Sequence, residues 1–121
     1  GWYDQGAGDI KSLHNYFSQL KVKPEERAFA FSEYGGYTYP VQEHLYSEKS
    51  FGYRTYQNQA QYRKAMDALA EKIRELTEQG LAAAVYTQLT DVEEESNGIL
   101  TYDRKVRKWE PQEAKDFCPK E

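Results

Sequence analysis

A long amphipathic segment between two short apolar runs restricts the fold of this chain more than any other feature. Residues 57–79 repeat apolar side chains at a period of about 3.6 residues, with charged side chains between them, and Gly80 follows directly. The apolar runs at 28–32 and 81–89 predict buried strands. Because a strand, a covering helix and a second strand form a unit whose strands are parallel, the sequence predicts an α/β fold on a parallel sheet.

The remaining segments extend this plan on both sides. Residues 9–16 alternate in character after a glycine-rich stretch and predict another strand. Residues 34–56 are dense in Tyr, Gly and Ser, which predicts a long loop and a candidate wall of an active site. The acidic loop at 91–96 is followed by a turn, the basic run at 104–108 predicts the start of another helix, and residues 110–121 have the composition of a disordered polar tail.

Composition and charge exclude several classes of function. A formal net charge of -4 gives no basic footprint for nucleic acid or an anionic membrane. No apolar run approaches the roughly 20 residues of a membrane helix, and the first four residues lack the features of a secretory signal. The single cysteine, Cys118, permits no internal disulfide and no thiolate metal cluster.

Metal and cofactor sites are not expected either. The two histidines, His14 and His44, are far apart in the sequence, so a zinc site is not predicted. The acidic run at 93–95 beside Asp91 has oxygen ligands for a hard cation, but such a run is more often a solvated loop. The expected partners are therefore neutral or small molecules.

Polar and aromatic side chains stand at the expected carboxyl ends of the strands, where parallel α/β folds place functional residues. The three ends are residues 14–16, 32–34 and 86–91. Glu33 follows an apolar strand and precedes two glycines, so its carboxylate would be held rigidly yet remain reachable, as a nucleophile or a general acid/base requires. The alternative is an ordinary strand-end glutamate that caps a loop.

The segment AFAFSEYGG at 28–36 resembles the seventh barrel strand of glycoside hydrolase family 2, whose members read S-E-[YF]-G around the catalytic nucleophile. LHNYF at 13–17 looks like the sixth strand, and NGILTYDRKVRK at 97–108 looks like the stretch that leads into the last helix. A whole barrel needs about 250 residues. The resemblance therefore implies that residues 1–109 are a C-terminal fragment, about strands six to eight, of a (β/α)8 TIM barrel, with a polar tail at 110–121.

The resemblance also implies roles for single residues. Glu33 falls on the nucleophile, and Tyr16 falls on the tyrosine that hydrogen-bonds and orients it. His14 is expected either at a sugar hydroxyl or as a packed neighbour of Tyr16. The side chains expected at the substrate are His14, Tyr34, Tyr86, Gln88 and Asp91, of which Asp91 would also order its loop.

Departures from the family pattern narrow what the resemblance implies. Thr87 and Gln88 stand where members often carry a tryptophan that packs on the sugar, so an aromatic platform would come from Tyr86 or from the loop at 37–53. Residues 95–97 replace the Asn-x-Lys motif of the family's glucuronidases, which argues against uronic acid substrates. Val106 replaces a proline. The general acid/base, a glutamate after an asparagine in strand four, has no counterpart in this sequence.

The resemblance thus implies part of a retaining β-glycosidase that hydrolyses neutral β-linked sugars through an ester on Glu33, without a cofactor. By itself the chain is expected to be inactive, because the acid/base belongs to the missing N-terminal part of the parent enzyme. Free sheet edges favour a homo-oligomer of the fragment. The alternative function is a degenerate barrel that binds carbohydrate without catalysis.

Overall fold

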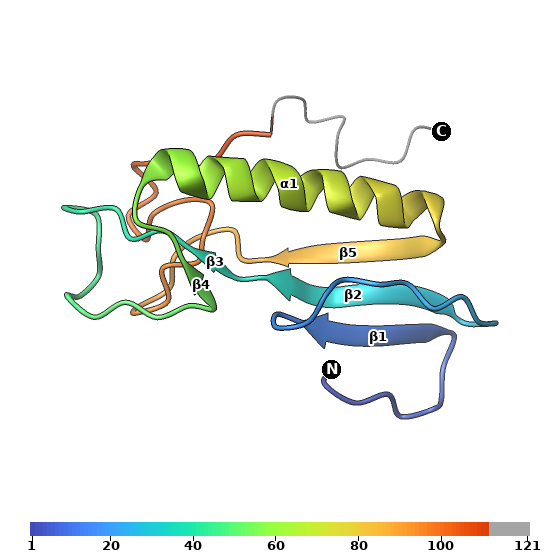
Figure 1. Cartoon of the computed structure of the whole chain (residues 1–121). Helices are drawn as coiled ribbons and strands as arrows, with labels where there is room; N and C mark the ends of the chain where they lie inside the picture. Colours follow the sequence, from blue (N-terminus) through green and yellow to red (C-terminus); the bar gives the residue numbers. More distant parts are fainter. Residues whose placement is uncertain (112–121) are drawn as a thin grey trace.

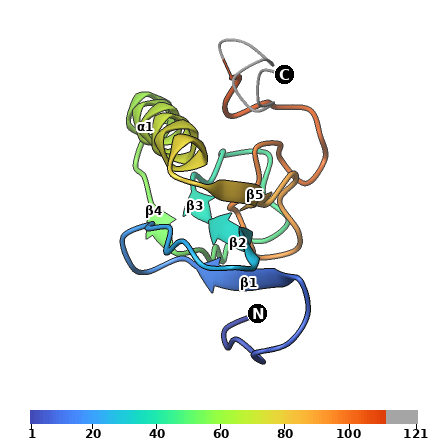
Figure 2. The same cartoon turned by 90° about the vertical axis from the view of Figure 1, so that its right-hand side faces the viewer.

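The computed structural model describes residues 1–111, which form a parallel three-stranded sheet covered by one long helix. The strands β1 (Ile10–Asn15), β2 (Ala28–Gly35) and β5 (Leu81–Thr87) are adjacent in the order β1-β2-β5, and both pairings are parallel. The helix α1 (Gln59–Glu78) lies on one face of the sheet in both views (Figures 1 and 2). The predicted parallel α/β arrangement is confirmed.

Helix α1 begins and ends close to where the sequence predicts. The Asn58 side chain caps the first turn by accepting a hydrogen bond from the Gln61 amide at 2.9 Å. After Glu78 the chain turns at Gly80, whose φ of +102° suits glycine. None of the helices in residues 1–111 has the length and the apolar character needed to cross a membrane.

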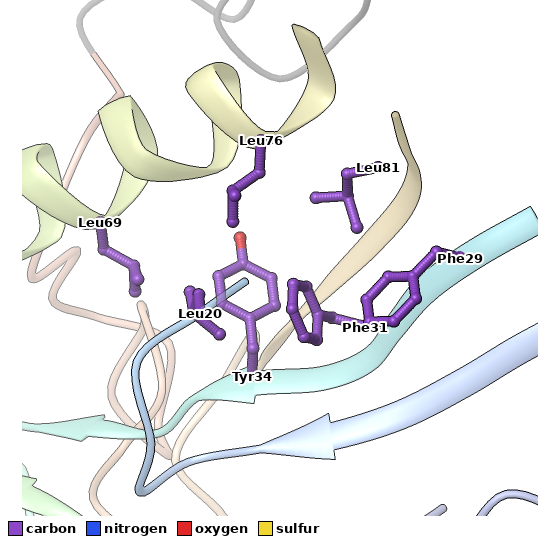
Figure 3. Close-up of a cluster of buried hydrophobic side chains, with 7 residues drawn as sticks. All are labelled: Leu20, Phe29, Phe31, Tyr34, Leu69, Leu76 and Leu81. Atoms are coloured by element: carbon purple, nitrogen blue, oxygen red, sulfur yellow. The ribbon is translucent and has the colours of Figure 1, made fainter. Parts of the chain in front are cut away.

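The main core lies between α1 and the sheet and is shown in Figure 3. Aromatic side chains of β2 point up toward the helix, where leucines of α1 meet them. Segment 16–27, which connects β1 to β2, adds Leu20 to the same cluster. The buried members of this cluster are Leu20, Phe29, Phe31, Tyr34, Leu69, Leu76 and Leu81.

Strand β2 contains a bulge that decides which way its last side chains point. Leu13 of β1 lies opposite Phe31, but the next residue, His14, lies opposite Glu33, so Ser32 is one residue too many. The pairing with β5 shifts over the same stretch, between Phe31 and Tyr34. As a result Phe31 and Tyr34 both reach the core, whereas Ser32 and Glu33 lie between them on the other side.

The sheet face opposite α1 carries small and exposed apolar side chains. Ile10 of β1 is 58% exposed and Val85 of β5 is 57% exposed. Because these positions alternate with residues that pack against the core, they point away from the helix. In the part of the chain that the structure describes, one face of the sheet is thus covered by α1 and the other face is open.

The segment at 34–56 is mostly loop, as predicted, but it holds a short parallel pair of strands. These are β3 (Tyr37–Thr38) and β4 (Arg54–Thr55). Gly52 lies so close to Thr38 that a Cβ atom at position 52 would be 1.5 Å from the Thr38 hydroxyl oxygen. The two arms of the loop therefore pack closely against each other.

The prediction that a helix starts in the run 104–108 is wrong, because the described residues up to 111 form no helix there. The Asp103 side chain accepts hydrogen bonds from the Thr101 hydroxyl at 2.6 Å and from the Lys105 amide at 3.1 Å, which stabilises a turn instead of a helix. Leu100 then pairs antiparallel with Arg107. Of the predicted polar tail at 110–121, positions 112–121 lie outside the described residues.

Candidate active site

The Glu33 carboxylate stands at the carboxyl end of β2 between two side chains of the neighbouring strand end. The Tyr16 hydroxyl donates a hydrogen bond of 2.8 Å to Glu33 Oε2. His14 Nδ1 lies 3.3 Å from the same oxygen. The Glu33 side chain is 42% exposed, so its carboxylate is oriented but open to solvent. The expected contact between Tyr16 and Glu33 is confirmed.

Tyr16 is held firmly enough to act as a fixed donor. Its residue is 7% exposed, and its ring stacks on Tyr53 with centroids 4.1 Å apart and an angle of 8° between the planes. Gly36 permits this stack, because a Cβ atom there would be 2.5 Å from Tyr53 and 3.0 Å from Tyr16. Burial raises the pKa of the Tyr16 hydroxyl, and the Glu33 carboxylate raises this pKa further, so Tyr16 remains a protonated donor at neutral pH.

The structure places His14 beside Glu33 and against Trp2. Its Nδ1 lies 3.3 Å from Glu33 Oε2, and its ring packs edge-on against Trp2 with centroids 5.4 Å apart. The His14 amide donates a hydrogen bond of 2.9 Å to the carbonyl oxygen of Gly1, which fixes Trp2 beside the end of β1. Geometry therefore leaves both roles open to His14.

Four aromatic residues next to this carboxylate site were not among the predicted site residues. Trp2, Phe17, Phe51 and Tyr53 form a chain of ring contacts that begins beside His14 and Tyr16. Phe51 and Tyr53 do come from the loop at 37–53, which was one predicted source of an aromatic platform. Trp2 and Phe17 could have been suspected only from the aromatic content of 15% and from the place of Phe17 directly after Tyr16.

Tyr34 and Tyr86 do not lie where substrate-binding side chains were expected. Tyr34 is 2% exposed and packs under α1, where burial raises its pKa to about 12 (Figure 3). Tyr86 meets Tyr34 edge-on at 5.8 Å, and both line an apolar cavity of about 30 Å³ together with Met66 and Trp109. A cavity of this size holds about one water molecule. Both tyrosines support the strand ends from the helix side, because neighbouring strand positions face opposite ways.

Gln88 and Asp91 are committed to the loop that follows β5. Gln88 Nε2 donates hydrogen bonds to Asn97 Oδ1 at 2.7 Å and to Glu95 Oε2 at 3.0 Å. Asp91 is 5% exposed and forms a 2.6 Å ion pair with Lys108. Asp91 was expected to order its loop and to lie at the substrate. It does order the loop, but a buried, paired carboxylate is not available as a sugar ligand.

Burial acts on both partners of this ion pair. It raises the pKa of Asp91 and lowers the pKa of Lys108, while the contact between them opposes both shifts. The pair has one further donor and one further acceptor, because the Gly98 amide donates to Asp91 Oδ1 at 2.8 Å and Lys108 Nζ donates to the Ser96 carbonyl oxygen at 3.0 Å. The pair is a structural anchor for residues 91–98.

The arrangement around Glu33 is suited to nucleophilic or general base chemistry on a neutral molecule. An exposed carboxylate is fixed by a neutral hydroxyl donor and flanked by aromatic rings. Within residues 1–111, no group of three or more His, Cys, Asp or Glu side chains is placed to hold a metal ion. Comparison of the sequence with models of known protein families gave no match, and comparison with curated proteins gave none either.

Proposed function

We propose that this chain is the C-terminal part, about strands six to eight, of the catalytic (β/α)8 barrel of a retaining β-glycosidase similar to glycoside hydrolase family 2. Glu33 is the nucleophile and the substrate is a neutral β-linked sugar. The observation that carries this proposal is the 2.8 Å hydrogen bond from Tyr16 to Glu33 across two neighbouring parallel strand ends. The resemblance requires that contact, and an unrelated strand-end glutamate would not need it.

In this reaction a Glu33 oxygen attacks the anomeric carbon, and the bond from that carbon to the leaving oxygen breaks. A glutamate of the parent's fourth strand donates the proton that the leaving oxygen needs. The product of this step is a glycosyl ester on Glu33. Water, deprotonated by the same glutamate, then attacks the anomeric carbon and releases the Glu33 carboxylate.

Tyr16 contributes by fixing the attacking carboxylate. Its hydroxyl is bonded to Oε2, so Oε1 is the oxygen left to attack. The bond also stabilises the carboxylate charge before attack, and it weakens when the ester forms. A donor that stays neutral suits this task, because a tyrosinate would repel the carboxylate.

The open sheet face supports the barrel assignment. In a closed barrel this face is the interior, where side chains from neighbouring strands fill the space in layers. Ile10 and Val85 are exposed in the described part of the chain, but the other strands of a parent barrel would cover them. The small residues Ala30 and Ala83, which pair across β2 and β5, leave room for larger side chains from the opposite wall.

The experiment is mechanism-based labelling of the full-length parent. A 2-deoxy-2-fluoro-β-glycoside should form an ester on Glu33, and Glu33→Gln should abolish both the label and turnover while leaving the fold intact. Glu48→Gln, at an exposed loop position, is the matched control and should behave as wild type. Labelling of another carboxylate would remove the assignment of Glu33.

The second candidate, a degenerate barrel that binds carbohydrate without catalysis, is favoured by one observation. The exposed rings beside Glu33 would serve sugar binding even where no bond is cleaved. An Asn-Glu pair in the parent's fourth strand supports the enzyme. Saturable sugar binding by a parent that lacks this pair and takes up no label supports the binding protein.

A further inference from the structure

Three of the rings beside Glu33 are unusually exposed for aromatic side chains that touch one another. Trp2 is 53% exposed, Phe17 is 71% exposed and Phe51 is 54% exposed. Trp2 and Phe17 stack with centroids 6.2 Å apart, and Tyr53 contacts Phe17 at 5.1 Å and Phe51 at 5.9 Å. We call Trp2, Phe17, Phe51 and Tyr53 the aromatic surface.

The aromatic surface is built from three separate segments, each held by its backbone. Trp2 follows Gly1, whose carbonyl oxygen accepts from the His14 amide. Phe17 directly follows β1 and Tyr16. The Tyr53 amide donates to the Gly36 carbonyl oxygen at 3.2 Å, and the Phe51 amide donates to the Glu94 carbonyl oxygen at 2.7 Å. The backbone next to Trp2, Phe51 and Tyr53 is thus anchored, and all four rings lie outside the two buried clusters.

Exposed and contiguous rings cost free energy in water, because apolar surface remains hydrated. A ligand ring with an apolar face would cover them and gain from stacking. The aromatic surface adjoins the carboxylate directly, since Tyr53 stacks on Tyr16 and Tyr16 bonds Glu33. Its occupant therefore lies next to the group on which Glu33 acts.

We infer that the aromatic surface is the subsite for the leaving group of the β-glycoside, and that this group is a ring with an apolar face. The inference rests on the proposed function, which places the anomeric carbon at Glu33. Exposure separates this subsite from that of the reacting sugar, because Trp2, Phe17 and Phe51 are exposed to solvent. Glu33 is instead flanked by the more buried side chains of Tyr16 and His14. An aryl ring and a second pyranose ring both have the required apolar face.

The test is a titration of the ¹⁵N-labelled 121-residue chain, followed by the indole N–H signals of its two tryptophans. Trp2 belongs to the aromatic surface. Trp109 is 4% exposed and donates to Asp67 at 2.8 Å, which makes it an internal reference. The probes are phenyl and methyl β-glycosides of glucose and galactose, the disaccharides cellobiose and lactose, and phenol.

Phenyl glycosides should move the Trp2 signal and leave the Trp109 signal in place, with a dissociation constant on the order of millimolar. Methyl glycosides, which lack a leaving-group ring, should bind at least about five-fold more weakly. A response to the disaccharides as well indicates that a sugar leaving group is accepted, and a response to phenyl glycosides alone indicates an aryl group. Equal responses to methyl and phenyl glycosides, or to phenol alone, would overturn the inference.

Variants separate the aromatic surface from other exposed rings. Phe17→Ala removes an exposed side chain and should weaken phenyl glycoside binding about two- to ten-fold without affecting the fold. Phe51→Ala should act in the same direction. Tyr102→Ala, in the exposed ring pair with Tyr46, is the matched control and should leave binding unchanged.

The inference and the proposed function fail in different ways. If the fluorosugar does not label Glu33 of the parent while Trp2 still responds to phenyl glycosides selectively, the nucleophile assignment is lost and the ring-binding site remains. If Glu33 is labelled but Trp2 does not respond, the leaving group binds elsewhere and the inference is wrong.

Discussion

Replacement of Lys108 by Met tests the ion pair that anchors the loop after β5. Methionine keeps the unbranched chain of Lys108, whose residue is 0% exposed, but removes its charge and its donors. The Asp91 carboxylate would remain buried, and its Oδ1 would keep only the hydrogen bond from the Gly98 amide. Its Oδ2 has no hydrogen-bond partner in the part of the chain that the structure describes. The variant thus leaves an uncompensated negative charge in the interior.

Breaking a buried pair by removing one partner costs about 3–5 kcal/mol. A domain of this length has a free energy of unfolding of roughly 6–18 kcal/mol, at about 0.05–0.15 kcal/mol per residue. We therefore expect Lys108→Met to lose a substantial share of the stability. Asp91→Asn with Lys108→Met removes both charges and should lose less than the sum of the two single variants.

The pH dependence of the loss follows from the direction of the Asp91 shift. Burial raises the pKa of Asp91, and removal of Lys108 takes away the contact that opposes this rise. A carboxyl whose folded pKa is raised contributes its full stability below the unfolded pKa of about 3.9 and loses it as pH rises through the folded pKa. The deficit of Lys108→Met should therefore be largest at pH 7 and shrink toward about pH 4.

Urea unfolding followed by tryptophan fluorescence measures this deficit, because Trp109 is buried next to Lys108. Lys105→Met, at an exposed position of the same turn, is the matched control and should change the free energy of unfolding by less than about 0.5 kcal/mol. A loss below about 1 kcal/mol for Lys108→Met, or a loss that does not change with pH, would refute the reasoning.

Three further predictions follow from the site and the sheet. Tyr16→Phe should cost about 0.5–1.5 kcal/mol in urea unfolding of the chain. In the proposed parent glycosidase it should lower kcat by about 10²-fold, because Glu33 loses its orienting bond; unchanged kcat would contradict this role. Hydrogen bonds from Thr101 and from His44 lower the pKa of Asp103, so the stability it contributes is present above its unfolded pKa and lost as pH falls through the folded value. Asp103→Asn should accordingly flatten the fall of Tm below about pH 4, and an unchanged profile would count against it. Because β1 and β5 are the two edge strands of the sheet, light scattering should give a mass above that of the 14.1 kDa monomer, and a monomer mass at micromolar concentration would exclude self-association.

Local periodicity was enough to predict most of the fold. The apolar stripe of α1 and the glycine after it predicted the helix at 57–79, which the structure has at Gln59–Glu78. The three predicted strands at 9–16, 28–32 and 81–89 are all present, although β2 continues to Gly35. The contact between Tyr16 and Glu33 was implied by the family resemblance, and it agrees with the way in which neighbouring parallel strands bring their carboxyl ends together.

The orientation of Glu33 was not readable from the alternation of β2. Phe29, Phe31 and Glu33 occupy every second position, so strict alternation would have placed the carboxylate in the core under α1. The bulge at Ser32 reverses this, and no sequence signal marks it. Tyr34 was expected at the substrate because it lies at the carboxyl end of a predicted strand, but the same bulge keeps it with Phe31 in the core.

Contacts between distant segments were also beyond the sequence. The acidic loop gave no sign that Asp91 would pair with Lys108, which lies 17 positions later in the chain. The aromatic surface joins Trp2 to Tyr53 through Phe17, and nothing in the spacing of these residues places them together. Such pairs depend on how the sheet end arranges its loops, which is a property of the whole fold.

The bulge in β2 has a consequence for which genetic changes this segment can accept. Ser32 has no counterpart in either neighbouring strand, because Leu13 and His14 lie opposite Phe31 and Glu33, and Ala84 and Tyr86 lie opposite Phe31 and Tyr34. Replacing Ser32 by another small residue would forfeit its hydrogen bond with Ser12 and leave the direction of Glu33 unchanged. Loss of the single codon for Ser32 would restore strict alternation and leave Glu33 opposite His14, still directed away from the leucines of α1. In this stretch, deletion of Ser32 should therefore preserve the direction of Glu33, whereas deletion of Phe31 or Tyr34 would remove an aromatic side chain from the core.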